Sequence, residues 1–505
     1  MQSEIFLTQR TQRTQRGQEV HALCDFIPAC RESFFKKSDM YDTIIIGAGM
    51  SGLVCGCYLA KAGMKVLIAE QHYKPGGYCT SFKRQGFTFD AAPHCFGSYR
   101  KNGVMRKILQ DLEVDKKLNI IRPDPSDIII TPDYKIPFWN DLEETIKEFQ
   151  TAFPKEANSI KNFFYLVLDT NPNSFSKMRS LTFKELLDQY FTDDKLKSIV
   201  SLPLLAIGGL PPSLMSAFVG AKLYSEFFLD GGYYPQGGMQ ALPDALAERF
   251  KEFGGELRLS CLAKKIKTKD NIVKGMILEK DGFIQSKYVI SNCDARQTFF
   301  KLLGKEKTEK EFYQKLKNMI PSMSNFILYL GMDKYFNPLQ NPGTIFYFSQ
   351  HYYLKKMYQA AQKGNIGDYS GHAVRISHDK STLNAYMLAP YKNKKYWLNN
   401  KYKFSESFIE IIEKNSIPDL SKHIVYKEAA TPHTLHRYTL NYKGASYGWA
   451  GTPAQFAVPG FRKPSFVQNL YLTGHWTTLG VGISGAAYVG YDTAQIILRK
   501  EKDLR

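Results

Sequence analysis

Three glycines near the start of the chain stand at a spacing that suits phosphate binding. They belong to the run Gly47-Ala48-Gly49-Met50-Ser51-Gly52, which fits G-x-G-x-x-G. Gly47 permits a tight turn, Gly49 lets the backbone approach a pyrophosphate, and Gly52 lets a helix pack closely on a strand. All six residues are therefore predicted to bind a dinucleotide, and the fingerprint is common to NAD and FAD.

The elements around this motif are the ones that a dinucleotide site needs. An apolar strand at residues 43–46 runs into the glycine turn, a helix of small residues continues to Ala62, and a second strand covers residues 65–69. In such a βαβ unit the amino end of the helix offers N–H groups and partial positive charge to phosphates. Glu70 ends the second strand, where an acid can bind ribose hydroxyls, and Gln71 is predicted to contact the cofactor beside it.

The composition limits the possible partners and chemistries. A length of 505 residues suggests two or three domains, and the formal net charge of +19 suits nucleic acid, an anionic membrane or a small anion such as pyrophosphate. Because the lysines are scattered and no nucleic-acid-binding module appears, we expect no nucleic acid partner. The eight cysteines include no CxxC pair, and neither a metal-ligand cluster nor a Ser-His-Asp arrangement stands out, so no metal is expected.

Further segments favour FAD over NAD. Residues 74–82 and 86–90, which contain Gly76, Gly77 and Tyr78, resemble the flavin-proximal segment of the phytoene desaturase, carotenoid isomerase and retinol saturase family. The resemblance continues in family order at residues 234–239, 289–295, 469–476 and 480–487, and covers the chain from residue 41 to about residue 498. It implies FAD as cofactor and an α/β fold: a Rossmann-like, amine-oxidase-like flavoprotein with a discontinuous α+β substrate domain.

The resemblance divides the chain into segments. The predicted FAD-binding domain comprises residues 41–100, 232–300 and 466–505, and the predicted substrate domain comprises residues 101–231 and 301–465. Residues 1–40 are expected to be a disordered extension or an overextended start, with a weak organelle-targeting peptide as the alternative. Alternating apolar residues between 256 and 290 predict several short strands, with turns at Gly275 and at Asp281-Gly282.

The family pattern also implies site residues beyond the first motif. The implied cofactor contacts are Gly76, Gly77, Tyr78, Leu262, Gly474, Gly482, Ile483 and Ser484, with Leu262 beside the adenine. A glycine-rich turn that opens the last helix can aim N–H groups at the flavin N1 and O2 region. His475 stands where many flavoproteins of this superfold have an acid that binds the ribityl chain, so that contact is not carried over. His94 is the catalytic candidate for proton transfer beside N5, with a structural histidine as the alternative.

The family acts on long apolar polyenes or isoprenoids. The resemblance therefore implies desaturation, isomerisation or saturation of such a chain by hydride transfer at flavin N5, in a tunnel of apolar and aromatic groups. Arg437, Tyr438 and Tyr442 are expected either to shape this tunnel or to be solvated or core residues. Two other functions stay open: a flavin amine oxidase, and a non-catalytic lipid- or prenyl-binding escort protein on the same fold.

A long uncharged segment suggests contact with a membrane. Residues 198–221 carry no charge and would span a bilayer as a helix, but Pro203, Gly208, Gly209, Pro211 and Pro212 argue against a continuous span. We predict a broken apolar hairpin that lines a tunnel or dips into one leaflet, with plain buried core as the alternative. Together with the positive net charge, the apolar segment predicts a cytoplasmic protein held peripherally on the membrane's cytoplasmic face.

Overall fold

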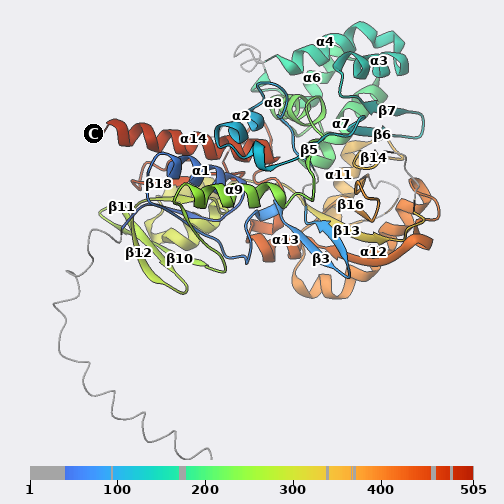
Figure 1. Cartoon of the computed structure of the whole chain (residues 1–505). Helices are drawn as coiled ribbons and strands as arrows, with labels where there is room; N and C mark the ends of the chain where they lie inside the picture. Colours follow the sequence, from blue (N-terminus) through green and yellow to red (C-terminus); the bar gives the residue numbers. More distant parts are fainter. Residues whose placement is uncertain are drawn as a thin grey trace, which may run out of the picture. The chain divides into compact units, whose positions relative to one another are not determined.

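Two β-sheets organise the described chain, with the first on the left and the second on the right of Figure 1. The computed structural model describes residues 40–92, 95–169, 178–336, 341–365, 367, 371–455, 462–477 and 482–503. The N-terminal extension predicted at residues 1–40 lies outside the described residues, apart from Met40.

The first sheet is built on the predicted βαβ unit. Strand β1 (Tyr41–Ile46) lies between β2 (Val66–Ala69) and β12 (Gly282–Ser291), and all three are parallel. Strand β9 (Glu256–Arg258) extends the sheet beyond β2, and β18 (Leu470–Leu472) runs parallel to β12. The four residues of β2 are all buried, as expected for a parallel strand covered on both faces. This sheet confirms the prediction of an α/β, Rossmann-like fold.

Helices from distant parts of the chain cover one face of this sheet. They are α1 (Met50–Lys61), α9 (Ala241–Glu252) and α14 (Gly482–Asp503), which share one apolar core with β1, β2 and β12. Helices α1 and α14 cross so closely that a Cβ at Gly490 would lie 2.4 Å from the carbonyl oxygen of Ser51. The other face packs against the hairpin of β10 (Ala263–Lys269) and β11 (Ile272–Leu278).

In this hairpin the turn predicted at Gly275 lies at other residues. Gly275 lies inside β11, with φ +144°, and a Cβ there would lie 2.1 Å from the carbonyl oxygen of Ile284 on β12. The turn between β10 and β11 is formed instead by Asp270 and Asn271, both with positive φ. Asp and Asn tolerate this conformation better than most residues, so they can replace glycine in a tight hairpin. The turn predicted at Asp281-Gly282 does separate β11 from β12.

The second sheet has the strand order β17-β13-β16-β15-β14-β6-β7. Its strands are β6 (Asp127–Ile130), β7 (Lys135–Phe138), β13 (Ser324–Met332), β14 (Ile345–Phe348), β15 (His372–Ile376), β16 (Thr382–Ala389) and β17 (Ile424–Ala430). One face packs on α12 (Lys394–Asn415). The other packs on a group of helices: α3 (Leu142–Ala152), α4 (Ala157–Leu168), α6 (Phe183–Tyr190), α7 (Asp194–Gly208) and α8 (Ala217–Leu223).

The uncharged segment 198–221 is mostly buried in this second group of helices. Pro203 does not interrupt α7, which continues to Gly208 and ends at Gly209 in the left-handed conformation. Of the residues expected to interrupt the segment, Gly209 does so, since its φ of +69° ends the helix, whereas Pro203 lies within the helix. Leu202, Leu205 and Ile207 line an internal cavity, as the tunnel interpretation predicted. None of the described helices is long and apolar enough to cross a bilayer.

Candidate active site

The carboxyl ends of the parallel strands bring the predicted cofactor residues together. Gly47 follows β1, Glu70 follows β2, Asn292 follows β12, and Gly474 comes two residues after β18. Since these strands are parallel, their carboxyl ends meet at one edge of the sheet, where doubly wound folds bind nucleotides. All four residues line one cavity of about 470 Å³.

The glycine turn leaves no room for side chains. Gly47 has a φ of +95°, and a Cβ at Gly52 would lie 2.1 Å from the carbonyl oxygen of Gly47. A Cβ at Gly49 would lie 2.9 Å from Nδ2 of Asn292. The first turn of α1 carries no acidic residue, and its N-cap, Gly49, makes no side-chain hydrogen bond. This helix end can therefore offer backbone N–H groups and positive potential to a pyrophosphate.

Glu70 is a buried acid held by the backbone. Its side chain accepts hydrogen bonds from the N–H of Ala48 at 2.7 Å and from the N–H of His72 at 2.8 Å. Burial raises the pKa of Glu70, and backbone donors at His72, Ala48 and Gln71 oppose the rise. A carboxylate has about four acceptor sites, so Glu70 can still receive ribose hydroxyls. The N–H of Cys261 donates to the Glu70 carbonyl at 2.8 Å, which places the neighbouring Leu262 beside this acid.

The flavin-proximal glycines lie against the first motif. Gly76, with φ +125°, donates its N–H to the carbonyl oxygen of Ala48 at 2.8 Å. Gly77, with φ +59°, would place a Cβ 3.4 Å from the Cα of Gly49. The backbone at residues 76–77 therefore forms a second wall of the same cavity.

Residues from the end of the chain complete the cofactor region. A Cβ at Gly474 would lie 2.3 Å from Oδ1 of Asn292, and one at Gly482 would lie 2.3 Å from the Phe227 ring. Gly482 and Ile483 open α14 and line the cavity. The Ser484 hydroxyl points elsewhere, because it donates to the carbonyl oxygen of Gly97 at 2.7 Å.

Most of the predicted contacts share the cavity wall. The predicted residues that line it are Gly47, Gly49, Met50, Ser51, Glu70, Gln71, Gly76, Gly77, Tyr78, Leu262, Gly474, Gly482 and Ile483. Ala48, Gly52 and Ser484 are not among its lining residues. His94, the catalytic candidate, lies outside the described residues, although Ala92 and Cys95 on either side line the cavity. Tyr438 lines it as well, whereas Arg437 and Tyr442 do not.

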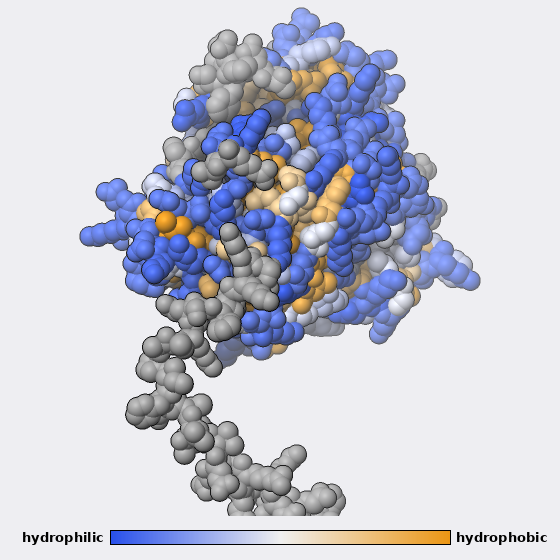
Figure 2. Space-filling view, turned by 60° about the vertical axis from the view of Figure 1, so that its left-hand side comes forward, coloured by the Kyte–Doolittle hydropathy of each residue, from blue (hydrophilic) through white to orange (hydrophobic). Residues whose placement is uncertain are grey.

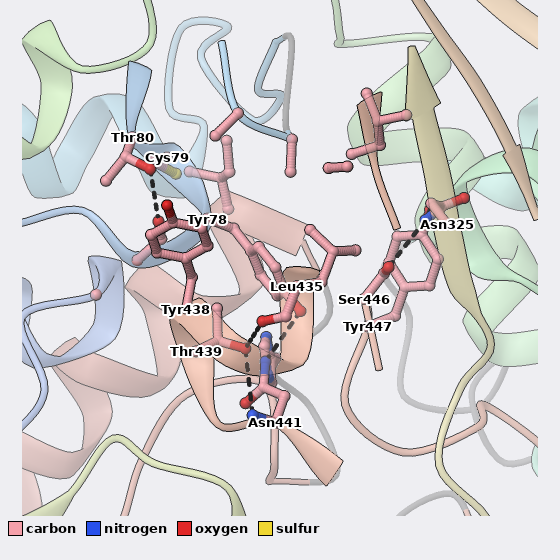
Figure 3. Close-up of a pocket in the computed structure, with 18 of the residues that line it drawn as sticks. Tyr78, Cys79, Thr80, Asn325, Leu435, Tyr438, Thr439, Asn441, Ser446 and Tyr447 are labelled. Carbon is pink, nitrogen blue, oxygen red and sulfur yellow. Dashed lines mark hydrogen bonds between the residues drawn. The ribbon is translucent and has the colours of Figure 1, made fainter. Parts of the chain in front are cut away.

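Asn441 is a polar centre beside the flavin-proximal wall that sequence reasoning missed (Figure 3). Its Nδ2 donates to the hydroxyl of Tyr78 at 3.2 Å and lies 3.4 Å from Nε2 of His475. Its Oδ1 accepts from Nε1 of Trp476 at 2.8 Å. Burial lowers the pKa of His475 to about 4, so its imidazole is neutral at neutral pH. The only sequence signal was the position of His475 directly after Gly474.

A second polar group lies where the cavity leaves the cofactor region. Asn325 at the start of β13 donates from Nδ2 to the hydroxyl of Ser446 at 2.9 Å and to that of Tyr447 at 3.3 Å (Figure 3). Tyr447 in turn donates to the carbonyl oxygen of Ala206 on α7 at 2.9 Å. These bonds tie the second sheet to the helical wall on either side of the cavity. Asn325, like Asn292, was missed because single amides in a sequence carry no distinctive spacing.

The remaining lining is mostly apolar. Among the described lining residues, Lys74 and Arg84 are the lysine and arginine side chains, and both belong to the flavin-proximal segment. The face shown in Figure 2 is hydrophilic around a central strip of hydrophobic residues, an arrangement that often marks a ligand groove. The described residues include no group of three His, Cys, Asp or Glu side chains placed to hold a metal ion.

The residues at the cofactor end fit FAD. The glycine turn has space that added Cβ atoms would fill, and the end of α1 is uncapped, so both suit the pyrophosphate of a dinucleotide. The buried acid after β2 suits the ribose. The second helix amino end, at Gly482, and the glycine pair at 76–77 extend the cavity past the first motif, where an isoalloxazine ring system can lie.

Comparisons with known proteins agree with this fit. A family model described as flavin containing amine oxidoreductase matches residues 50–374. A lycopene-forming phytoene desaturase of Pseudescherichia vulneris is 23% identical over 91% of this chain and 99% of its own. The all-trans-retinol 13,14-reductase of Danio rerio is 24% identical over 92% of this chain and 87% of its own.

Solved structures show the same fold. Putrescine oxidase covers 91% of this chain and 99% of its own with a TM-score of 0.60, at 15% identity. This likeness concerns the fold alone, whereas the family model covers more than half of the chain. The chain therefore belongs to the flavin containing amine oxidoreductase family, and its cofactor is FAD.

Proposed function

We propose that this FAD-dependent oxidoreductase transfers hydride between its flavin and a long apolar polyene or isoprenoid chain. The observation that carries the proposal is the length of the cavity floor. Six neighbouring strands of the second sheet, β17, β13, β16, β15, β14 and β6, all contribute lining residues. Five gaps of about 4.8 Å between neighbouring strands give a floor about 24 Å long. Such a floor suits an extended chain far better than a small amine.

The chemistry of the walls supports the same substrate class. Ile327, Ala373 and Ile345 lie on the floor, and Leu202 and Leu205 of α7 form part of the opposite wall. Burial of apolar surface at about 25 cal/mol per Å² can supply the affinity for a ligand with few polar groups. Both relatives named above act, by their names, on polyenes: one is a desaturase and one a reductase.

The protein's own residues position and shield the reacting carbons. FAD, when bound, supplies the hydride acceptor or donor at N5. The Asn441 carboxamide holds the Tyr78 hydroxyl, and the neutral His475 ring adds no charge to the apolar surroundings. The helical wall and the sheet floor exclude water from the chain between them.

The first test is the visible spectrum of the purified protein, followed by anaerobic incubation with all-trans-retinol, phytoene and lycopene and mass analysis of the products. We expect a bound-flavin spectrum and a change of two hydrogens in at least one polyene, or a shifted polyene spectrum at constant mass if the reaction is isomerisation. Hydrogen peroxide release from putrescine, with every polyene unchanged, would replace this proposal with an amine oxidase. A protein that stays colourless after reconstitution with FAD would favour a lipid escort.

We further propose that the protein binds the cytoplasmic face of an anionic membrane peripherally, through a surface called here the lysine face. It comprises α11 (Leu354–Lys363) and the first half of α12, with neighbouring residues. Its lysines are Lys355, Lys356, Lys363, Lys392, Lys394, Lys395, Lys401 and Lys403, and residues 351–365 and 390–405 contain no Asp or Glu. Leu398 and Tyr402 are 73% and 70% exposed. We propose this surface as the membrane contact in place of segment 198–221, because the burial of that segment leaves it little contact with lipid.

The lysine face also surrounds one end of the cavity. Ala361 and Gly364 line the cavity, and a Cβ at Gly364 would lie 3.3 Å from the Pro390 side chain, which precedes α12. A substrate dissolved in a bilayer would enter the cavity here without crossing water. Basic residues near an anionic leaflet contribute about 1 kcal/mol each, and exposed apolar side chains insert at the headgroup boundary.

Sedimentation with vesicles tests the lysine face. We expect binding to phosphatidylcholine vesicles that contain phosphatidylserine, and weak binding to phosphatidylcholine alone. The variant Lys394→Glu/Lys395→Glu/Leu398→Ser should bind more than about tenfold more weakly, given about 1 kcal/mol per lysine. The matched charge reversal Lys265→Glu/Lys267→Glu on β10 should have a much smaller effect. Equal losses in both variants would mean that net charge alone, and not this face, drives binding.

A further inference from the structure

Asp127 is a buried carboxyl group in the apolar part of the cavity. It begins β6 with 1% of its surface exposed, and it lies in register with Ile345 on the neighbouring β14. Both residues line the cavity. β6 is the last of the six strands that form the floor, at the opposite end from β17. An extended substrate on this floor would therefore end beside Asp127.

The carboxyl group has fewer hydrogen-bond partners than it can accept. The Ser126 hydroxyl donates to its Oδ2 at 2.7 Å, and the Tyr347 hydroxyl is its other side-chain partner. A carboxylate accepts about four hydrogen bonds, and a protonated carboxyl also donates one. A pure hydrocarbon pressed against Asp127 would leave this capacity unused, at a cost in binding free energy.

The surroundings of Asp127 favour a neutral polar partner. The groups that face it are Tyr347 from β14, Tyr224 from the helical turn after α8, Cys95 and the cation Arg122. Burial raises the pKa of Asp127 to about 7 despite Arg122, and the pKa values of Tyr224, Tyr347 and Cys95 are raised as well. The buried Arg375 on β15 lies near Cys95 as well, but neither Arg375 nor Arg122 is among the described lining residues, so an anionic substrate end would face this acid without a lining cation. A hydroxyl both donates and accepts, so it suits either protonation state of Asp127.

We propose that Asp127 binds a terminal hydroxyl group of the substrate, which makes the substrate class a polyene or isoprenoid alcohol and not a pure hydrocarbon. The inference rests on the proposed function of a polyene oxidoreductase. Asp127 is a specificity-determining residue in this arrangement.

The test compares all-trans-retinol with its deoxy analogue, in which a methyl group replaces the terminal CH₂OH. Turnover gives kcat and KM, and perturbation of the flavin absorbance gives binding without turnover. For the wild-type holoenzyme we expect a KM at least tenfold lower for the alcohol. Asp127→Leu should abolish this difference by raising KM for the alcohol, with kcat less affected. Asp127→Asn should retain most of the difference, because a carboxamide also donates and accepts.

Ile345→Val is the matched control, since it alters the neighbouring lining residue in volume and not in polarity. We expect it to shift KM for both compounds by the same factor. Flavin content and Tm of each variant establish that it is folded, and Asp127→Ala, which also removes the carboxyl group, takes the place of Asp127→Leu if the leucine variant does not fold.

Different outcomes separate the two proposals. If Asp127→Leu keeps the preference for the alcohol, or if the wild type prefers the hydrocarbon, the hydroxyl site is wrong while the polyene oxidoreductase stands. A stronger preference for retinylamine than for retinol would assign Asp127 to an ammonium group and overturn the inference. If neither the alcohol nor the hydrocarbon reacts or perturbs the flavin spectrum, the proposed function itself fails.

Discussion

Replacing Gly52 by alanine is expected to weaken the binding of FAD. The added Cβ would lie 2.1 Å from the carbonyl oxygen of Gly47 and 3.1 Å from Nδ2 of Asn292. Because the closest atom is backbone, the glycine turn must shift to relieve the contact. Overpacking of this kind costs typically about 1–3 kcal/mol, which corresponds to roughly fivefold to 150-fold weaker binding. The measurement is the flavin-to-protein ratio after reconstitution and a titration with FAD.

Gly56→Ala is the control in the same helix. A Cβ there would lie 2.7 Å from Cδ1 of Ile68 and 3.1 Å from the Phe250 ring, away from the glycine turn. We expect this variant to lower Tm and yet bind FAD with an affinity close to that of the wild type. If both variants lose flavin in proportion to their loss of Tm, the contact at Gly47 has no specific role in cofactor binding.

Replacing Asp127 by asparagine is expected to stabilise the protein at alkaline pH. The pKa of Asp127 is about 7 in the folded protein, against about 3.9 in an unfolded chain. Between these values the folded state binds the extra proton, so the free energy of unfolding of the wild type falls as pH rises. Above pH 7 the wild type has lost on the order of 4 kcal/mol of its free energy of unfolding through this group. Tm of the two proteins, measured from pH 4 to pH 8.5, should diverge as pH rises and converge near pH 4.

Asp133→Asn provides a comparison of opposite sign. Asp133 lies between β6 and β7 and accepts hydrogen bonds from Lys195 at 2.6 Å and from Tyr352 at 2.9 Å. These partners lower the pKa of Asp133, so its contribution to stability is present above its unfolded pKa and is lost as pH falls through its folded pKa. The asparagine variant should therefore be slightly less stable than the wild type at neutral pH. A parallel pH profile for both variants would contradict the assignment for Asp127.

The cofactor end of the site could be predicted because its signals are local. The strand, glycine turn and helix at residues 41–61 form from neighbouring residues, and the acid after β2 follows at a fixed distance. The α/β fold follows from this unit, since parallel strands need helical connections that cover the sheet. The short strands between residues 256 and 290 could also be predicted, because their side chains alternate.

The substrate end could not be predicted in the same way. Asp127, Asn325 and Asn441 become site residues only when strands and loops far apart in the chain meet around the cavity. Each is a single polar residue with no spacing that marks it. Local rules also had exceptions: α7 accommodates Pro203, and Asp270-Asn271 makes a turn that was assigned to Gly275. In both places the surrounding packing decides between conformations of similar local energy.

The close crossing of α1 and α14 has a consequence for biosynthesis. α1 is complete after 61 residues, but its partner begins at Gly482, and β18 and Gly474 also emerge late. During synthesis α1 therefore stays exposed and apolar, with an unfinished cofactor pocket, until Gly482 and the rest of α14 have been made. FAD can be captured only after that point, so chains truncated before Gly482 should be colourless substrates for chaperones and proteases.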